Sequence, residues 1–494
     1  MSDQIVPPAP SWRKWAWAAA AVAVAAVVAL VALVAVPLAV EAAKRCGDGV
    51  IRSGPGSECV GVTDGSVMFE PELAAIQEHI HTENTQVAAS GKPYVSIAVL
   101  LPMTRGADGG ELVTMPWLRH HLEGAHLAQL AANHTTTWGG TPQIRLLLAN
   151  AGSGFGQWAT AVDELDQLRD QERIVAVAGI GLSVENAVRA MERLAELGLP
   201  IIGSTLTADS LTAVPGFLRI SPPNSDQARA AAMYAKPRAQ QALLVRDENP
   251  NDHYAITLAE EFSEYYLDET HRFSGPVERY NSQEGGVANT FNHMLPNICH
   301  AAPQLVYFAG RAVHAITFIK ALAERSCRDI PITVLTGEDM SLHTAPDEAV
   351  RTALESGVSV VYTASAHPQS WENQQHDLFN LHSVAQFAPD CRGPVCYRAL
   401  SDDSLDDASA IVAHDAVVTA VQAIRQSSVD GAVVSAADVL QSMNRLHGAT
   451  AVRGAAGILS FDEAGDPVNK PIPMLRLLPG RSPEFLGLSW PGIE

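Results

Sequence analysis

The sequence of 494 residues lacks the short motifs of several common enzyme classes. It contains no GxxxxGK[ST] phosphate-binding loop and no HExxH zinc-protease pair. Residues 152–156 read GSGFG, which departs from the dinucleotide-binding GxGxxG pattern. Residues 181–185 read GLSVE, which lacks the last glycine of the GxSxG nucleophile elbow. We therefore expect a protein that is not an enzyme and that needs neither a cofactor nor a metal.

Positive charge is also scarce. Lysine and arginine together number 33 against 54 acidic residues, and the formal net charge is −21. Such a chain repels phosphate backbones, which argues against a nucleic-acid partner. Hydrophobic residues make up 47% of the sequence and charged residues only 18%, as in a globular protein. The roughly 450 residues after position 45 exceed one ordinary core and indicate two lobes.

No cysteine pair has the CxxC spacing of zinc or thioredoxin-like sites. All six cysteines follow the apolar block at 15–40, and an even number on one side of it indicates an oxidising compartment. Proximity in the sequence favours two disulfides and leaves the remaining two cysteines as a third pair. The alternative is six buried free thiols in a cytosolic protein. The expected pairs are Cys46–Cys59, Cys391–Cys396 and Cys299–Cys327.

The block at 15–40 is uncharged and apolar. At about 1.5 Å per residue, a helix of this length exceeds the roughly 30 Å hydrocarbon core of a bilayer. A cleaved signal peptide is the rival interpretation, but Val40-Glu41-Ala42 is a poor cleavage site and the block is longer than usual. We expect an uncleaved transmembrane anchor, with residues 1–14 as a cytoplasmic tail. The protein would then be a single-pass membrane protein, with the bulk of the chain extracellular.

The segment at 46–91 is predicted to be a disulfide-linked extension. Glycine, serine and proline in its first half indicate irregular turns, and a helix is expected at 71–89. From residue 94, short β-branched runs alternate with helical patterns, and this alternation restarts near residue 242. Such alternation is typical of open parallel α/β sheets buried on both faces. The expected strands are 95–102, 144–149, 174–180, 199–204, 242–247, 305–310, 331–337 and 358–364, and 457–468 resembles a hairpin.

Four stretches, in order and spacing, carry a resemblance to a known family. They are LEGAHLAQLAAN with the strand after it, VAGIGLSVENAVRA with LPIIGSTLTADSLT, FLRISPPNSDQARAAAMY, and GAAGILSFDEAGDPV. Over residues 94–478 the chain resembles the type 1 periplasmic binding proteins, specifically the leucine/isoleucine/valine-binding branch of ABC-transporter solute receptors.

The resemblance implies two Rossmann-like α/β lobes joined by a three-strand hinge, here preceded by the transmembrane helix. Lobe one would contain residues 93–222 plus 365–450, and lobe two residues 223–364 plus 451–490. Ligands of open α/β sheets lie beyond the carboxyl ends of the strands. The family captures amino acids or similar small polar solutes by lobe closure and delivers them to an ABC permease.

In lobe one the resemblance places Ser183, Ser204, Thr205 and Thr207 at the ligand. Ser183 stands between a predicted strand and a predicted helix, so its hydroxyl could instead cap that helix. Helix N-termini also suit a ligand carboxylate, and both roles are compatible. The threonines could equally be capping residues of a polar loop.

In lobe two Tyr254 matches a tyrosine that closes over the ligand. Glu338 or Asp339 matches the acid that pairs with a ligand ammonium, or else is a solvated loop acid. Arg311 departs from the aromatic residue often found there. If it faces the cleft, it favours an anionic or more polar ligand; it could equally lie on the surface.

The preferred interpretation is a membrane-anchored extracellular solute-binding protein for an ABC transporter. The alternative is a sensory or scaffolding ectodomain on the same fold with an altered pocket. An exported α/β hydrolase is the third and least favoured class.

Overall fold

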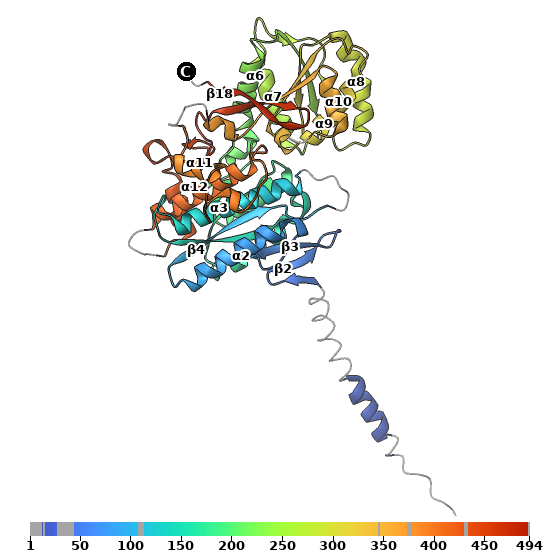
Figure 1. Cartoon of the computed structure of the whole chain (residues 1–494). Coiled ribbons are helices and arrows are strands. Elements are labelled where there is room, and N and C mark those ends of the chain that lie inside the picture. The colour runs from blue at the N-terminus through green and yellow to red at the C-terminus, as the bar shows by residue number, and fades with distance from the viewer. Residues whose placement is uncertain are drawn as a thin grey trace, which may run out of the picture.

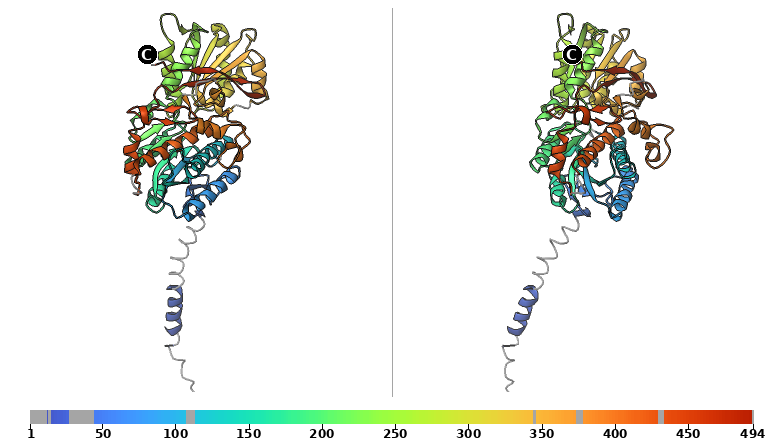
Figure 2. Two further views of the ribbon diagram at one scale, coloured as in Figure 1. Left: turned by 60° about the vertical axis from the view of Figure 1, so that its left-hand side comes forward. Right: turned by 90° about the vertical axis from the view of Figure 1, so that its left-hand side faces the viewer.

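The computed structural model describes residues 12, 15–26, 44–106, 113–343, 346–372, 378–428 and 433–492. Most of them form two α/β lobes, one stacked on the other (Figure 1). The helical residues 15–26 are exposed and lie apart from the lobes (Figures 1 and 2). Within the described ranges, no helix has the length and apolar character needed to cross a membrane. Residues 27–40 of the expected anchor, and all of the expected tail except Trp12, lie outside those ranges.

The first sheet contains the early apolar runs as parallel strands. Their residues are almost all buried, because helices such as α3 (Met115–His134) and α12 (Ser409–Ser427) pack against the sheet. The strand order is β1-β2-β3-β5-β4-β6-β7-β8. The parallel members are β4 (Tyr94–Leu101), β5 (Gln143–Asn150), β6 (Ile174–Gly179), β7 (Ile201–Gly203) and β8 (Phe217–Arg219).

The extension is more regular than the sequence indicated. Its first half forms three antiparallel strands, and the last of them pairs with β5, so the extension lengthens the first sheet. Gly49 and Gly54 adopt φ of 71° and 72°, which lets the chain turn back where irregular structure was expected. The expected helix is present as α2 (Ala74–Ala89). The strands are β1 (Arg45–Gly47), β2 (Val50–Ser53) and β3 (Glu58–Thr63).

The second sheet repeats the parallel arrangement and adds an antiparallel edge. Its order is β10-β9-β12-β13-β14-β17-β18, where β10 is Arg272–Phe273, and the short β11 (Glu278–Tyr280) also pairs with β9. The parallel core is β9 (Gln241–Asp247), β12 (Leu305–Ala309), β13 (Ile332–Thr336) and β14 (Val358–Thr363), while β17 (Ile472–Leu478) and β18 (Arg481–Ser489) are antiparallel. The helices are α6 (Asn224–Ala235), α7 (His253–Tyr266), α8 (Val287–Ala301), α9 (Ala312–Leu322) and α10 (Glu348–Glu355).

The chain passes between the two lobes three times: between β8 and α6, after β14, and before β17. The third passage comes later than the expected boundary at 451. Val452, Leu459 and Phe461 belong to the hydrophobic core of the first lobe, because the hairpin of β15 (Val452–Arg453) and β16 (Ile458–Leu459) packs near α12.

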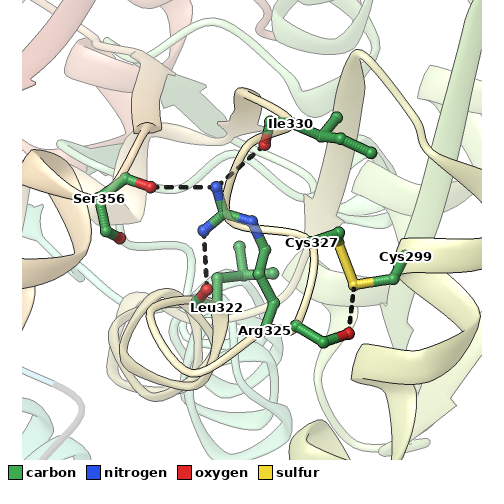
Figure 3. The surroundings of a disulfide bond; sticks show 7 residues. Cys299, Leu322, Arg325, Cys327, Ile330 and Ser356 are labelled. Carbon is green, nitrogen blue, oxygen red and sulfur yellow. Dashed lines mark hydrogen bonds between the residues drawn. A yellow bond between two sulfur atoms is a disulfide. The ribbon is translucent and has the colours of Figure 1, made fainter.

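The structure contains the three disulfides that the sequence predicts. Cys299–Cys327 joins α8 to the loop after α9 (Figure 3). Beside it lies Arg325, which is 1% exposed and donates hydrogen bonds to carbonyl oxygens of Leu322, Ile330 and Ser356. The disulfide and the arginine together fix this loop.

Candidate functional site

Ser183 lies in the loop after β6, at the carboxyl edge of the first sheet. Its buried hydroxyl accepts hydrogen bonds from the backbone N–H groups of Thr207, at 3.2 Å, and Ala208, at 3.4 Å. The N-cap of helix α5 (Glu185–Glu196) is Val184, so the expected capping role of Ser183 is wrong. The hydroxyl instead connects the loop after β6 to the loop after β7.

The loop after β7 presents one of its three candidate side chains to the cleft. Thr205 lines a cavity between the lobes, and its Oγ1 donates to the carbonyl of Gly181 at 2.8 Å. Ser204 lies behind it, fully buried, and donates to the carbonyl of Gly179. Thr207 is also fully buried, and its Oγ1 has no hydrogen-bond partner among the described residues. Thr205 and Ser183 are thus the candidates of lobe one that reach the cavity.

Tyr254 and Asp339 form part of the opposite wall, in lobe two. The backbone N–H of Asp339 donates to the Tyr254 hydroxyl at 3.3 Å. Burial and the nearby carboxylates of Asp339 and Glu338 raise the pKa of Tyr254 well above its usual value, so the phenol stays neutral. Asp339 Oδ2 accepts a hydrogen bond of 2.7 Å from the N–H of Ala312, the first residue of α9. Asp339 therefore caps a helix and borders the cavity at once.

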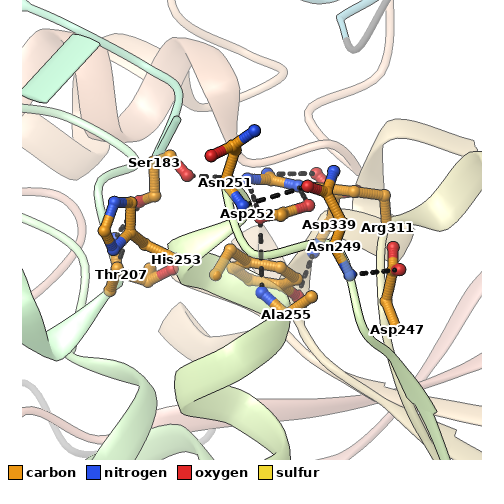
Figure 4. A network of polar contacts seen from close by, with 12 residues as sticks. Ser183, Thr207, Asp247, Asn249, Asn251, Asp252, His253, Ala255, Arg311 and Asp339 are labelled. Atoms are coloured by element: carbon orange, nitrogen blue, oxygen red, sulfur yellow. Dashed lines mark hydrogen bonds and ion pairs between the residues drawn. The ribbon is translucent and has the colours of Figure 1, made fainter. Parts of the chain in front are cut away.

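Arg311 lies in the cleft, 5% exposed (Figure 4). Its Nε and Nη2 donate to the two carboxylate oxygens of Asp252, each at 2.8 Å, and its Nη1 lies 3.8 Å from Asp339 Oδ1. The guanidinium carbon lies 4.6 Å from the centre of the Tyr254 ring. Nη2 also donates to the backbone carbonyl of Ser183 at 3.0 Å, across the cleft. A side chain of the protein thus bridges the two lobes where a solute was expected.

Glu338 connects the cavity to the hinge. It is 7% exposed and accepts a hydrogen bond from the Ser365 hydroxyl, and burial raises its pKa to about 7. The carbonyls of Ser365 and Ile220 accept hydrogen bonds, each 2.9 Å, from the ammonium of Lys470. Lys470 is fully buried, and burial lowers its pKa to about 8. The two ionisable groups are therefore linked through Ser365.

The cavity between the lobes is small, about 30 Å³. This is room for about two water molecules. A solute of amino-acid size therefore requires Arg311 or the lobes to move. Six of the eight candidates from the sequence line this cavity: Ser183, Thr205, Tyr254, Arg311, Glu338 and Asp339.

The residues at or near the cavity that were not expected include Trp117, Asp252, Asp407 and Lys470. Asp252 precedes helix α7 as its N-cap, a signal that the sequence displays. The Oδ2 atom of Asp407 lies 2.6 Å from Nδ1 of His120, at hydrogen-bond distance. Burial lowers the pKa of His120, but the hydrogen bonds and charges of Asp407, Asp403 and Glu123 together outweigh burial and raise it to about 9. The contacts of Asp407 with His120, and of Lys470 with Ile220 and Ser365, join residues that are far apart in the sequence, so no local pattern predicts them.

Two α/β lobes joined by three chain passages, with a cavity at the carboxyl ends of both sheets, define the fold of type 1 periplasmic binding proteins. A leucine-binding protein from Thermotoga maritima has a TM-score of 0.58 at 18% identity, covering 80% of this chain and 98% of its own. A solute-binding protein from R. palustris in complex with benzoate has a TM-score of 0.57 at 17% identity, covering 81% and 97%. An ABC-transporter substrate-binding protein from Aeropyrum pernix has a TM-score of 0.59 at 14% identity, covering 82% and 97%. No protein-family model and no curated protein matches the sequence.

Proposed function

We propose that the protein is an extracellular solute-binding protein that serves an ABC transporter and performs no chemistry. The cavity between the lobes, lined by hydroxyls and carboxylates from both, carries the proposal. Each lobe supplies part of the polar contacts, so a solute would favour the closed state through contacts that the open state lacks. Structures of similar fold that hold leucine, isoleucine or benzoate support this class of function.

We further propose that residues 15–40 anchor the protein in the membrane with the lobes outside. The uncharged block and the three disulfides support this arrangement. Membrane fractionation with N-terminal sequencing tests it. A protein that stays in the membrane fraction with its original N-terminus is expected, and a product that begins near Ala43 would identify a cleaved signal peptide.

A sensory or scaffolding ectodomain is the second candidate, and Arg311 favours it. Its contact with the Ser183 carbonyl already joins the lobes without a solute. Such a protein would present its closed lobes to a partner protein and would bind no small molecule with useful affinity.

A solute screen separates the two functions. The full chain, in a mild detergent, is tested by thermal shift against amino acids, aromatic carboxylates, peptides and sugars, because a ligand of the native state raises its stability. Hits are then titrated by calorimetry against Thr205→Val and against Thr352→Val, a matched control at an exposed position of α10. Loss of the Thr205 hydroxyl should weaken binding by about 1–3 kcal/mol. A panel without any binder would favour the second candidate. Equal affinities of the two variants would instead contradict the assignment of the binding site to the cavity that Thr205 lines.

A further inference from the structure

We propose that the cleft contains a guanidinium-binding site that Arg311 itself occupies, so that the protein carries an internal ligand that holds its lobes together. The site accepts guanidino or alkylammonium compounds once the Arg311 side chain is removed or displaced. This inference is independent of the proposed function, because it requires no external solute.

The surroundings of Arg311 match what a planar cation requires. The carboxylate of Asp252 accepts two parallel hydrogen bonds of 2.8 Å, the fork geometry that distinguishes guanidinium from ammonium recognition. Asp339 adds a second negative charge at 3.8 Å, and the face of Tyr254 lies under the cation. Two carboxylates and an aromatic face thus surround one guanidinium, which is the composition of a cation site.

Neighbouring helices and strands hold this site in place. Asp252 is the N-cap of α7, and Asp339 accepts from the first N–H of α9. Gly310 precedes Arg311, and a Cβ at this glycine would lie 2.0 Å from the hydroxyl of Tyr280. A side chain at position 310 would therefore clash with Tyr280, and glycine lets the chain lie against this ring directly before Arg311.

The bound guanidinium also reaches the other lobe. Nη2 donates to the Ser183 carbonyl at 3.0 Å, a hydrogen bond with a charged donor between two buried residues. His253 makes another contact between the lobes. Its Nε2 lies 3.2 Å from Glu185 Oε2 and its Nδ1 lies 3.3 Å from the Ser210 hydroxyl, but these side chains are considerably more exposed than Arg311. Of these two contacts, the one that Arg311 makes is the stronger, because it is more deeply buried.

An internal ligand has a consequence for solutes. Arg311 is tethered beside its site, so its effective concentration there is on the order of millimolar or higher. A cationic solute must compete with it, whereas a variant without the side chain presents the site empty. Arginine differs from alanine by the atoms of ethylguanidinium, so this compound is the probe that fits the vacated space.

Chemical rescue tests the inference. Arg311→Ala, wild type and Arg328→Ala, which removes an exposed arginine of the same lobe, are compared with and without ethylguanidinium. Only Arg311→Ala should respond, with a rise in Tm on the order of 1–3 °C at ten times Kd. Ethylammonium should act more weakly because it lacks the fork, and sodium chloride at equal ionic strength should have no effect.

Spin labels at Glu192 of α5 and Glu260 of α7, introduced through cysteine, report the distance between the lobes. This distance should be short in the wild type without solute, longer in Arg311→Ala, and short again with ethylguanidinium. Equal distances in wild type and variant, or equal responses of Arg311→Ala and Arg328→Ala to the probe, would overturn the inference. If Arg311→Ala does not fold, Arg311→Gln combined with Asp252→Asn removes both charges together. That double variant must still open the lobes for the inference to stand.

Discussion

The ammonium of Lys470 donates a hydrogen bond of 2.9 Å to the backbone carbonyl of Ser365. A second bond, also 2.9 Å, goes to the carbonyl of Ile220. Ile220 lies where the chain first leaves lobe one, Ser365 lies where it returns, and Lys470 lies on the third passage. One buried side chain thus connects all three segments of the hinge. Backbone carbonyls compensate part of the cost of burying its charge.

Replacing Lys470 with methionine should change how stability depends on pH. Burial lowers the pKa of Lys470 to about 8 from 10.5, so the unfolded chain binds more protons than the folded one between these values. The free energy of unfolding of the wild type, relative to Lys470→Met, should therefore rise with pH through this window. Urea unfolding at several pH values measures it. Lys320→Met, at a partly exposed position of α9, is the control.

Glu338→Gln should show the opposite pH dependence. Burial raises the pKa of Glu338 to about 7 from 4.5, so the folded chain holds a proton that the unfolded chain has released. The wild type therefore loses stability relative to the variant as pH rises from 4.5 to 7. Above this range the variant should be more stable by on the order of 3 kcal/mol, and below it the two should agree. The exposed Glu348→Gln serves as the comparison, and a constant difference at all pH values would contradict the expectation.

Removing the hydroxyl of Ser183 and removing the hydroxyl of Thr207 should change the free energy of unfolding in opposite directions. Thr207→Val removes a buried group without a partner in the described chain, and should raise the free energy of unfolding by up to about 1 kcal/mol. Ser183→Ala removes the acceptor of two buried N–H groups, and should lower it by about 1–3 kcal/mol. Urea unfolding of the two variants measures both. A larger loss of stability in Thr207→Val than in Ser183→Ala would contradict the expectation and would indicate a hydrogen-bond partner for the Thr207 hydroxyl.

The sequence predicts the parallel strands well because burial on both faces leaves an uninterrupted apolar run. β4, β6 and β12 each match an expected run to within about two residues. The sequence did not predict β1, β2 and β3, because these strands are short and half polar. The pairing of β3 with β5, which joins them to the first sheet, is a long-range contact. Local propensity carries no information on such a contact.

The sequence predicted which loops contribute residues to the candidate site, but it predicted the role of each residue less well. Strand ends identified Thr205, Arg311 and Glu338 as neighbours of the cleft, since carboxyl ends of parallel strands converge there. The role of Arg311 depends on its side-chain direction and on Asp252, which is 59 residues away in the sequence. Only the structure shows that the Arg311 guanidinium lies in the cleft and contacts both lobes.

The disulfides should stabilise the protein in an order set by the loops they close. The cysteines are separated by 28 residues in Cys299–Cys327, 13 in Cys46–Cys59 and 5 in Cys391–Cys396. Loop-closure entropy then gives losses of about 3.5, 3 and 2 kcal/mol when each pair is replaced by serine. Urea unfolding of the three double variants under oxidising conditions measures the order. Adding a reductant to all samples is the control, because it should remove the differences between wild type and variants. If Cys391/Cys396→Ser proves the most destabilised, native contacts around that short loop, and not the entropy of the unfolded chain, determine the contribution of the disulfide.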